Sequence, residues 1–211
     1  MPPTLPSRKR MALELRPGIT LYLARHGETE ANVQRRFSGK RDTPLTERGL
    51  GQARAIGEIL QREVGMRPKL HFVSSPLARA RITMEIVLSV LGVPLSDFTT
   101  DPRLQEIDLG EWDQLTDAEA RALGSATFDA RAADKWHVHV PGGENYAEVA
   151  ARARGWAQSL EADTFAVSHG ALTRILRGLF QGLDWRAMSA LDEPQGVVFR
   201  IRDNRVVRLD A

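Results

Sequence analysis

The sequence predicts an α/β protein with three layers, α/β/α, in which helices cover both faces of a mostly parallel central sheet. Two observations support this fold class. Short apolar segments with strand character alternate with longer segments whose apolar residues recur at helical spacing, a pattern typical of parallel sheets. The first short segment, Ile19 to Ala24, is apolar on both of its alternating faces, as expected of a strand that is covered on both sides.

The predicted domain begins at Ile19. Residues 1–18 are rich in proline and charge, lack periodicity and end at Pro17-Gly18. We therefore interpret residues 1–18 as a flexible N-terminal extension and residues 19–211 as a single domain.

The remaining elements follow from local patterns. After a polar loop, Thr46 can cap a helix in which Leu50, Ala53 and Leu60 recur at helical spacing. Most of 97–143 is predicted to be irregular. The other predicted elements are, in order, strand 70–74, helix 77–91 closed by Gly92, helix 117–123, helix 146–160, strand 164–168, helix 171–180 and two strands within 196–209 joined by a turn at Asp203-Asn204.

Charge and composition exclude several classes of function. The chain has 29 Lys and Arg against 27 Asp and Glu, a formal net charge of +2, far from the basic excess of a nucleic-acid-binding protein. Cysteine is absent, which excludes thiol catalysis, cysteine-ligated zinc and disulfides. No apolar stretch of about 18 residues predicts a membrane span. We expect a cytoplasmic protein that binds a small molecule; its oligomeric state stays open, a dimer being one option.

Three motifs share one structural position. Arg25-His26-Gly27 follows the first predicted strand, Ser74 to Arg79 follows the second, and Ser168-His169-Gly170 follows a third. Ligands of open α/β sheets bind outside the carboxyl ends of the strands, so these segments are expected to converge. Arginine and histidine side chains, with the amides of a helix that starts near Ala171, suit a tetrahedral oxyanion.

At these residues the sequence resembles the histidine phosphatase superfamily, which includes the cofactor-dependent phosphoglycerate mutases. The resemblance covers roughly Leu21 to Leu179 and rests on several motifs in the family's order. These are Leu23 to Asn32 (LARHGETEAN), Asp42 to Gly49 (DTPLTERG), Ser74 to Ala80 (SSPLARA), Leu104 to Ile107 (LQEI), Pro141 to Glu144 (PGGE) and Val167 to Gly170 (VSHG).

The resemblance implies a phosphoglycerate mutase-like α/β/α domain that needs neither a metal nor a cofactor, and it assigns roles to individual residues. His26 is expected to be the nucleophile that becomes phosphorylated, and Glu106 the proton donor. Arg25, Arg79 and His169 are expected to form the phosphate pocket, and Asn32 and Thr43 to add contacts with the substrate. A neutral imidazole is a good nucleophile at pH 7, and burial or the phosphate charge can raise the pKa of a glutamate enough for it to donate a proton. Asp108 and Glu111 are alternative acids.

Departures from the mutases favour hydrolysis of a small phosphomonoester. The mutases have a Glu-Arg-His-Tyr-Gly run after the acid, whereas Glu106 is followed here by Ile107-Asp108-Leu109-Gly110, similar to the phosphatase branch. The 37 positions from Glu106 to Gly143 leave little material for a cap that excludes water. One departure from the phosphatase branch is Gln114, which stands where that branch usually has glycine.

Three other functions stay open. They are a phosphoglycerate mutase, a phosphate-binding module without catalysis, and a metal hydrolase that uses His26, His137, His139 and His169. Because His137 and His139 lack an obvious third ligand, we expect them on a substrate loop or the surface. The sequence does not name the substrate.

Overall fold

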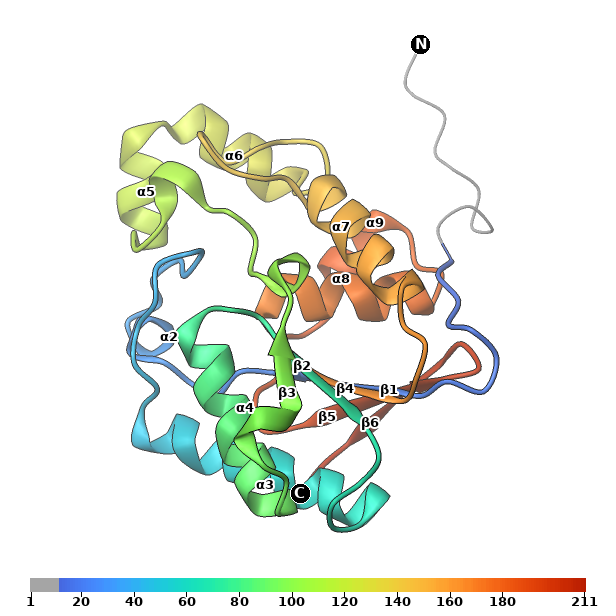
Figure 1. The fold of residues 1–211 in the computed structure, drawn as a ribbon. Helices are drawn as coiled ribbons and strands as arrows, with labels where there is room; N and C mark the ends of the chain where they lie inside the picture. Colours follow the sequence, from blue (N-terminus) through green and yellow to red (C-terminus); the bar gives the residue numbers. More distant parts are fainter. Residues whose placement is uncertain (1–11) are drawn as a thin grey trace.

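The computed structural model describes residues 12–211, which form a six-stranded sheet with helices on both faces (Figure 1). The strand order is β3-β2-β4-β1-β5-β6. β1 is parallel to β4, and β2 is parallel to both β3 and β4, while β5 and β6 are antiparallel additions at one side. The strands are β1 (Leu21–Arg25), β2 (His71–Ser74), β3 (Phe98–Thr100), β4 (Thr164–Ser168), β5 (Val198–Arg202) and β6 (Arg205–Leu209). The predicted α/β class and the mostly parallel sheet are confirmed.

The helices form the outer layers. Figure 1 shows α3 and α4 on one side of the sheet, α7, α8 and α9 on the other, and α5 and α6 beyond the sheet at one end. The α-helices are α2 (Glu30–Val33), α3 (Glu47–Val64), α4 (Ala78–Leu91), α5 (Asp117–Leu123), α6 (Ser125–Ala133), α7 (Tyr146–Gln158), α8 (Gly170–Phe180) and α9 (Trp185–Ser189). Short 3₁₀ helices span Leu95–Asp97 (η1), Pro102–Leu104 (η2) and Gly110–Trp112 (η3).

Strand β1 separates two hydrophobic cores. Leu21 and Leu23 belong to the core under α7 and α8, whereas Tyr22 and Ala24 belong to the core under α3 and α4. Successive side chains of a strand point to opposite faces, so a strand covered on both sides must be apolar throughout. This burial on both faces is the reason for the unbroken apolar run that the sequence shows.

Local signals placed several element ends correctly. The Thr46 hydroxyl accepts a hydrogen bond from the N–H of Gly49 over 3.0 Å and caps α3. Gly92 closes α4 with a φ of +67°. Asp203 and Asn204 join β5 to β6 with φ values of +47° and +60°, as a tight hairpin turn requires.

The prediction for 97–143 was incomplete. Besides the expected helix at 117–123, the structure contains β3, α6 and the 3₁₀ helices η2 and η3 there, and η1 ends at Asp97. It also contains the unpredicted helices α2 and α9. β3 is only three residues long, too short for an alternation signal. α6 begins directly after α5 without a side-chain cap, so the sequence carried no start signal for it.

The predicted extension also needs a correction. Residues 1–11 lie outside the described part of the chain. Leu13, however, is 1% exposed, belongs to the core under α7 and α8, and donates its backbone N–H to the carbonyl of Leu179 over 3.0 Å. This part of residues 1–18 therefore packs on the domain. Within residues 12–211, no helix is long and apolar enough to cross a membrane.

Candidate active site

The register of β1 and β4 brings the two motif histidines together. Arg25 pairs with Ser168 at the carboxyl ends of these parallel strands, so His26 and His169 each follow one member of a paired position. The backbone N–H of His26 extends the pairing by donating to the carbonyl of Ser168 over 2.9 Å. Convergence at the strand ends is confirmed for these two residues.

Both imidazoles are buried, which favours their neutral forms. The rings lie 5.1 Å apart between centroids at an angle of 60°, and the residues are 2% and 0% exposed. Burial and the nearby Arg25 and Arg79 lower the pKa of His26 well below its usual value. Burial, Arg79 and His26 lower the pKa of His169 in the same way. A protonated pair is therefore disfavoured in the absence of an anion.

A backbone contact fixes the tautomer of His26. Nδ1 of His26 lies 2.7 Å from the carbonyl oxygen of Gly27, which can only accept, so Nδ1 carries the proton. Nε2 consequently keeps its lone pair and can act as a nucleophile. Neither ring nitrogen of His169 has a hydrogen-bond partner among the described residues.

Glycine allows the turn after β1 to pack against α3. A Cβ atom on Gly27 would lie 2.2 Å from the carbonyl oxygen of Gly49, and one on Gly49 would lie 2.1 Å from the carbonyl oxygen of Glu28. Neither position tolerates a side chain without movement of the backbone. The turn that carries His26 is therefore held directly against the first turn of α3.

Two arginines flank the histidines. Arg25 donates from Nη1 to the carbonyl of Glu193 over 2.7 Å. Arg79 is buried, donates to the carbonyls of Gly39 and Arg41 over 2.6 and 3.0 Å, and pairs with Asp42 at 3.0 Å. The Nε atoms of both arginines are buried without a hydrogen-bond partner in residues 12–211. A buried donor without a partner destabilises the folded protein, so the two Nε–H groups are candidates to bind an oxyanion.

Glu106 is held at the start of α8. One carboxylate oxygen accepts from the N–H of Ala171 over 3.2 Å and the other from the N–H of Ile107 over 3.0 Å. Burial, followed by the charge of Glu193, raises the pKa of Glu106, although the hydrogen bond from Ile107 and the charges of Arg25 and Arg79 oppose the shift. A raised pKa favours the protonated form that a proton donor needs.

Arg152 on α7 fixes the backbone around Glu106. It donates to the carbonyls of Arg103, Gln105 and Glu106 over 2.8, 2.7 and 3.1 Å. Glu144, from the Pro141 to Glu144 motif, pairs with Arg152 at 3.0 Å and accepts the N–H of Asp108 over 2.8 Å. This motif therefore supports the loop on both sides of Glu106.

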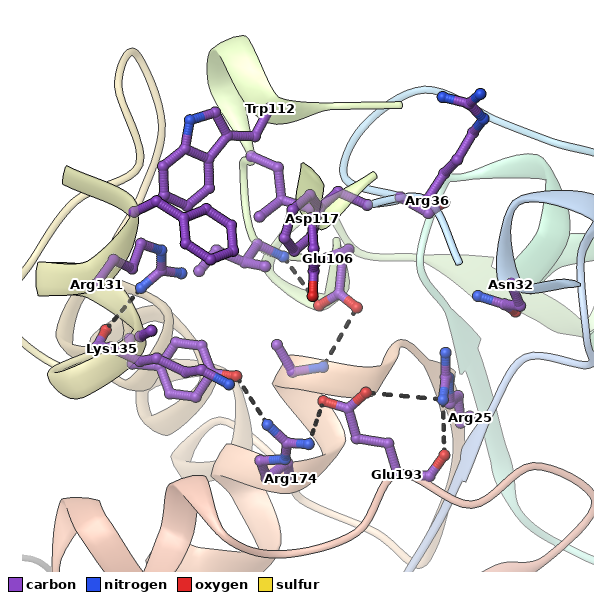
Figure 2. A pocket seen from close by; sticks show the side chains of 18 of the residues that line it. Arg25, Asn32, Arg36, Glu106, Trp112, Asp117, Arg131, Lys135, Arg174 and Glu193 are labelled. Atoms are coloured by element: carbon purple, nitrogen blue, oxygen red, sulfur yellow. Dashed lines mark hydrogen bonds and ion pairs between the residues drawn. The ribbon is translucent and has the colours of Figure 1, made fainter. Parts of the chain in front are cut away.

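Four of the predicted site residues line one cavity of about 410 Å³, which is large for a phosphate group alone. They are Arg25, His26, Asn32 and Glu106. Figure 2 labels Arg25, Asn32 and Glu106 around this cavity. The side-chain oxygen of Asn32 accepts a hydrogen bond from the side-chain amide of Gln195 over 3.0 Å.

The other predicted residues lie outside the cavity lining. His169 contacts the ring of His26, and Arg79 is close enough for its charge to lower the pKa of both histidines. The Thr43 hydroxyl is buried and has no hydrogen-bond partner within residues 12–211. Thr43 is not among the described residues that line the cavity, so its contact with substrate stays a prediction.

Several cavity residues were missed by sequence reasoning. Arg174 on α8 pairs with Glu193 at 3.0 Å and donates to the Tyr146 hydroxyl over 3.1 Å. Arg174 follows Ala171 by three positions and so shares its face of the helix, a signal that could have found it. Lys135 and Glu193 lie outside helices and strands, where no periodic signal exists.

His137 and His139, which the sequence offered as possible metal ligands, each contact a different carboxylate. Nδ1 of His137 lies 2.8 Å from Asp134, and Nε2 of His139 lies 3.1 Å from Glu148. Among residues 12–211, no group of three His, Cys, Asp or Glu residues could hold a metal ion.

Comparison with known proteins decides the family. A family model described as the histidine phosphatase superfamily (branch 1) matches residues 21–205. This chain belongs to that superfamily. The family resemblance drawn from the motifs is thus confirmed.

Relatives within the superfamily carry different names. A curated protein from Salmonella newport, named "Probable phosphoglycerate mutase GpmB", is 34% identical over 205 residues, 91% of this chain and 85% of the relative. The alpha-ribazole phosphatase from Shigella flexneri has a TM-score of 0.79 at 25% identity and covers 92% of this chain and 96% of its own. A mycobacterial glucosyl-3-phosphoglycerate phosphatase in complex with VO₃ has a TM-score of 0.73 at 29% identity. The match covers 92% of this chain and 98% of that protein's chain.

Proposed function

We propose that this superfamily member is a phosphomonoester hydrolase that works through a phosphohistidine at Nε2 of His26. The observation that carries the proposal is the tautomer of His26, whose protonated Nδ1 faces Gly27 and leaves Nε2 free beside buried donors without partners. A nucleophile with a lowered pKa stays unprotonated and reactive at neutral pH. A non-catalytic phosphate-binding module would need neither this tautomer nor the buried carboxylic acid.

In the first step, Nε2 of His26 attacks phosphorus and the bond to the ester oxygen breaks. Glu106 gives its proton to the departing oxygen, so the alcohol leaves neutral. Arg25, Arg79 and His169 donate to the phosphoryl oxygens and stabilise the charge that they carry in the transition state.

In the second step, the roles of Glu106 reverse. Its carboxylate takes a proton from water, the water oxygen bonds to phosphorus, and the bond to His26 breaks. Inorganic phosphate leaves, with Glu106 protonated again and His26 neutral. The hydrogen bonds that Glu106 accepts from Ala171 and Ile107 hold the carboxylate in place for both transfers.

Transfer to water is favoured over transfer back to an organic substrate. The segment from Glu106 to Gly143 spans only 37 positions, and solved relatives that resemble this chain over most of its length are named phosphatases. A mutase must keep water from its phosphohistidine over many turnovers, which requires a closed cover.

A phosphoglycerate mutase is the second candidate because a 34% identical relative carries that name. The test supplies 3-phosphoglycerate with catalytic 2,3-bisphosphoglycerate and follows 2-phosphoglycerate and inorganic phosphate in one tube. We expect phosphate release to dominate. Isomerisation faster than phosphate release by about 100-fold, equivalent to ~2.7 kcal/mol of barrier, would overturn hydrolysis as the function.

A further inference from the structure

The cavity has a second cationic end that the proposed reaction does not use. Figure 2 shows Arg131 and Lys135 on one side of the cavity and Arg25 and Asn32 on the other, with Glu106 between them. Arg131 belongs to α6, and Lys135 follows four residues later, just beyond the end of that helix. Both therefore come from a different part of the chain than the strand ends that carry Arg25, His26 and His169.

Neither cation has a carboxylate partner within residues 12–211. Arg131 is 6% exposed and donates from Nη1 to the carbonyls of Lys135 and Val138 over 3.1 and 3.2 Å. Lys135 is half-buried, and the described residues offer its ammonium group neither a hydrogen bond nor an ion pair. Burial lowers the pKa of both side chains, and Glu193 and Asp117 only partly oppose the shift at Lys135.

The nearby carboxylates are engaged or exposed. Glu193 pairs with Arg174 and Arg25, and Asp134 pairs with His137. Asp117 lines the cavity but is exposed and lies beyond ion-pair distance of Lys135. Five cationic side chains line the cavity against three carboxylates, one of which is Glu106 in its proposed protonated form. Buried charges are ordinarily paired, so Lys135 and Arg131 would stabilise an anionic group bound at this end of the cavity.

We propose that Lys135, with Arg131 beside it, binds a second anionic group on the substrate, and that the substrate class is small organic phosphates with a carboxylate or a second phosphate. This inference rests on the proposed function, because it assigns the first phosphate to the end with His26. Arginine and lysine both donate to carboxylate and phosphate oxygens, which is the chemistry that the two candidate groups share.

An apolar wall accompanies the second cationic end. Phe37, Trp112 and Phe128 line the same cavity, with the ring of Trp112 5.9 Å from Phe37 and 5.4 Å from Phe128. These rings exclude water from one side of the cavity and strengthen the attraction between Lys135 and an anion. They also give the carbon skeleton of a substrate a surface to pack on.

The test compares matched substrates on wild-type protein and on K135M, which keeps most of the length of the side chain and removes its charge. The carboxylate pair is 3-phosphoglycerate and glycerol 3-phosphate; the phosphate pair is glucose 1,6-bisphosphate and glucose 1-phosphate. We expect wild-type kcat/KM to favour the doubly anionic member of at least one pair by about 10-fold or more, as one charged hydrogen bond supplies. K135M should lose most of this preference through KM, K135R should recover part of it, and K69M, at an exposed lysine, should keep it.

The two pairs identify the anion, and a binding measurement separates this inference from the proposed function. If the wild-type protein prefers the doubly anionic substrate only in the carboxylate pair, the second anionic group is a carboxylate. If it does so only in the phosphate pair, the group is a second phosphate. The same pairs are titrated into H26A by calorimetry, where a preference in Kd that K135M removes supports the inference even if no substrate is hydrolysed. Failure to release p-nitrophenol from p-nitrophenyl phosphate would count against the proposed function alone. Equal kcat/KM and equal Kd within both pairs, or an equal loss on both members in K135M, would overturn the inference.

Discussion

The imidazole rings of His26 and His169 lie 5.1 Å apart between centroids, although 143 positions separate the residues in the sequence. The parallel pairing of β1 with β4 produces this contact, because each histidine follows a strand end in the same register. The proximity of two neutral rings and two arginines is the basis of the proposed phosphoryl transfer.

The first prediction concerns the nucleophile. H26A removes the nitrogen proposed to attack phosphorus, so we expect kcat to fall by about 10³-fold or more, as the loss of a covalent nucleophile does elsewhere. Rapidly quenched wild-type protein should carry a phosphate that is labile in acid and stable in base, located at His26 by peptide mass spectrometry. H71A, at an exposed histidine on β2, serves as the control and should retain activity. Phosphate trapped on a serine or aspartate would contradict the assignment.

The second prediction concerns the pH dependence. Burial raises the pKa of Glu106 and lowers that of His26, and both shifts widen the pH range in which the acid is protonated while the base is neutral. The plot of kcat/KM against pH should be bell-shaped, with an alkaline limb where Glu106 loses its proton and an acid limb where His26 or the substrate phosphate gains one.

E106Q tests the alkaline limb directly. The variant should flatten that limb and slow the first turnover of alkyl phosphates by about 10²–10⁴-fold, the range of general acid catalysis. The burst of p-nitrophenol from p-nitrophenyl phosphate should change much less, because that leaving group needs no proton. Equal losses on the two substrates would point to Asp108 or Glu111 as the acid.

The third prediction concerns Arg152 as a positioning residue. Its guanidinium bonds to three carbonyls of the loop that carries Glu106, so R152Q should displace the carboxylate. Small displacements of a catalytic group cost up to about 10²-fold, and we expect kcat for alkyl phosphates to fall by about 10–100-fold with little change in KM. The alkaline limb should shift as well, which a general loss of stability would not produce.

Two variants accompany R152Q. R152K should recover part of the activity, and R54Q, at an exposed arginine on α3, should behave as wild type. An unchanged pH profile in R152Q, with equal losses for alkyl and p-nitrophenyl phosphates, would rule out the positioning role.

The fourth prediction concerns Gln114, which stands where the phosphatase branch usually has glycine. Its φ is +74°, in the left-handed region that costs a residue with a Cβ atom about 1–2 kcal/mol. Q114G should therefore raise the free energy of unfolding by about 1 kcal/mol, after part of the gain is lost to the flexibility of glycine in the unfolded chain. Urea unfolding measures the change. Q114A keeps the strain and should give no gain; equal stability of the two variants would contradict the prediction.

The sequence by itself determined the fold class, most helices and strands, and the residues at the strand ends. These features depend on local sequence. A strand buried on both faces must be apolar, and Thr46 caps the helix that it precedes. The turn at Asp203-Asn204 is specified by those two residues. His26 and His169 could be paired in advance because parallel strands end at the same edge of a sheet.

The tertiary structure alone decided what surrounds that edge. Arg131, Lys135 and Glu193 lie in segments without a predicted pattern, and they meet Arg25 and Arg174 only because α6 and the chain before β5 pack beside the strand ends. The sequence also could not predict that Leu13 lies in the core, because its contact with Leu179 joins residues far apart in the chain. Such contacts depend on packing between distant segments, and local periodicity carries no information about which segments will meet.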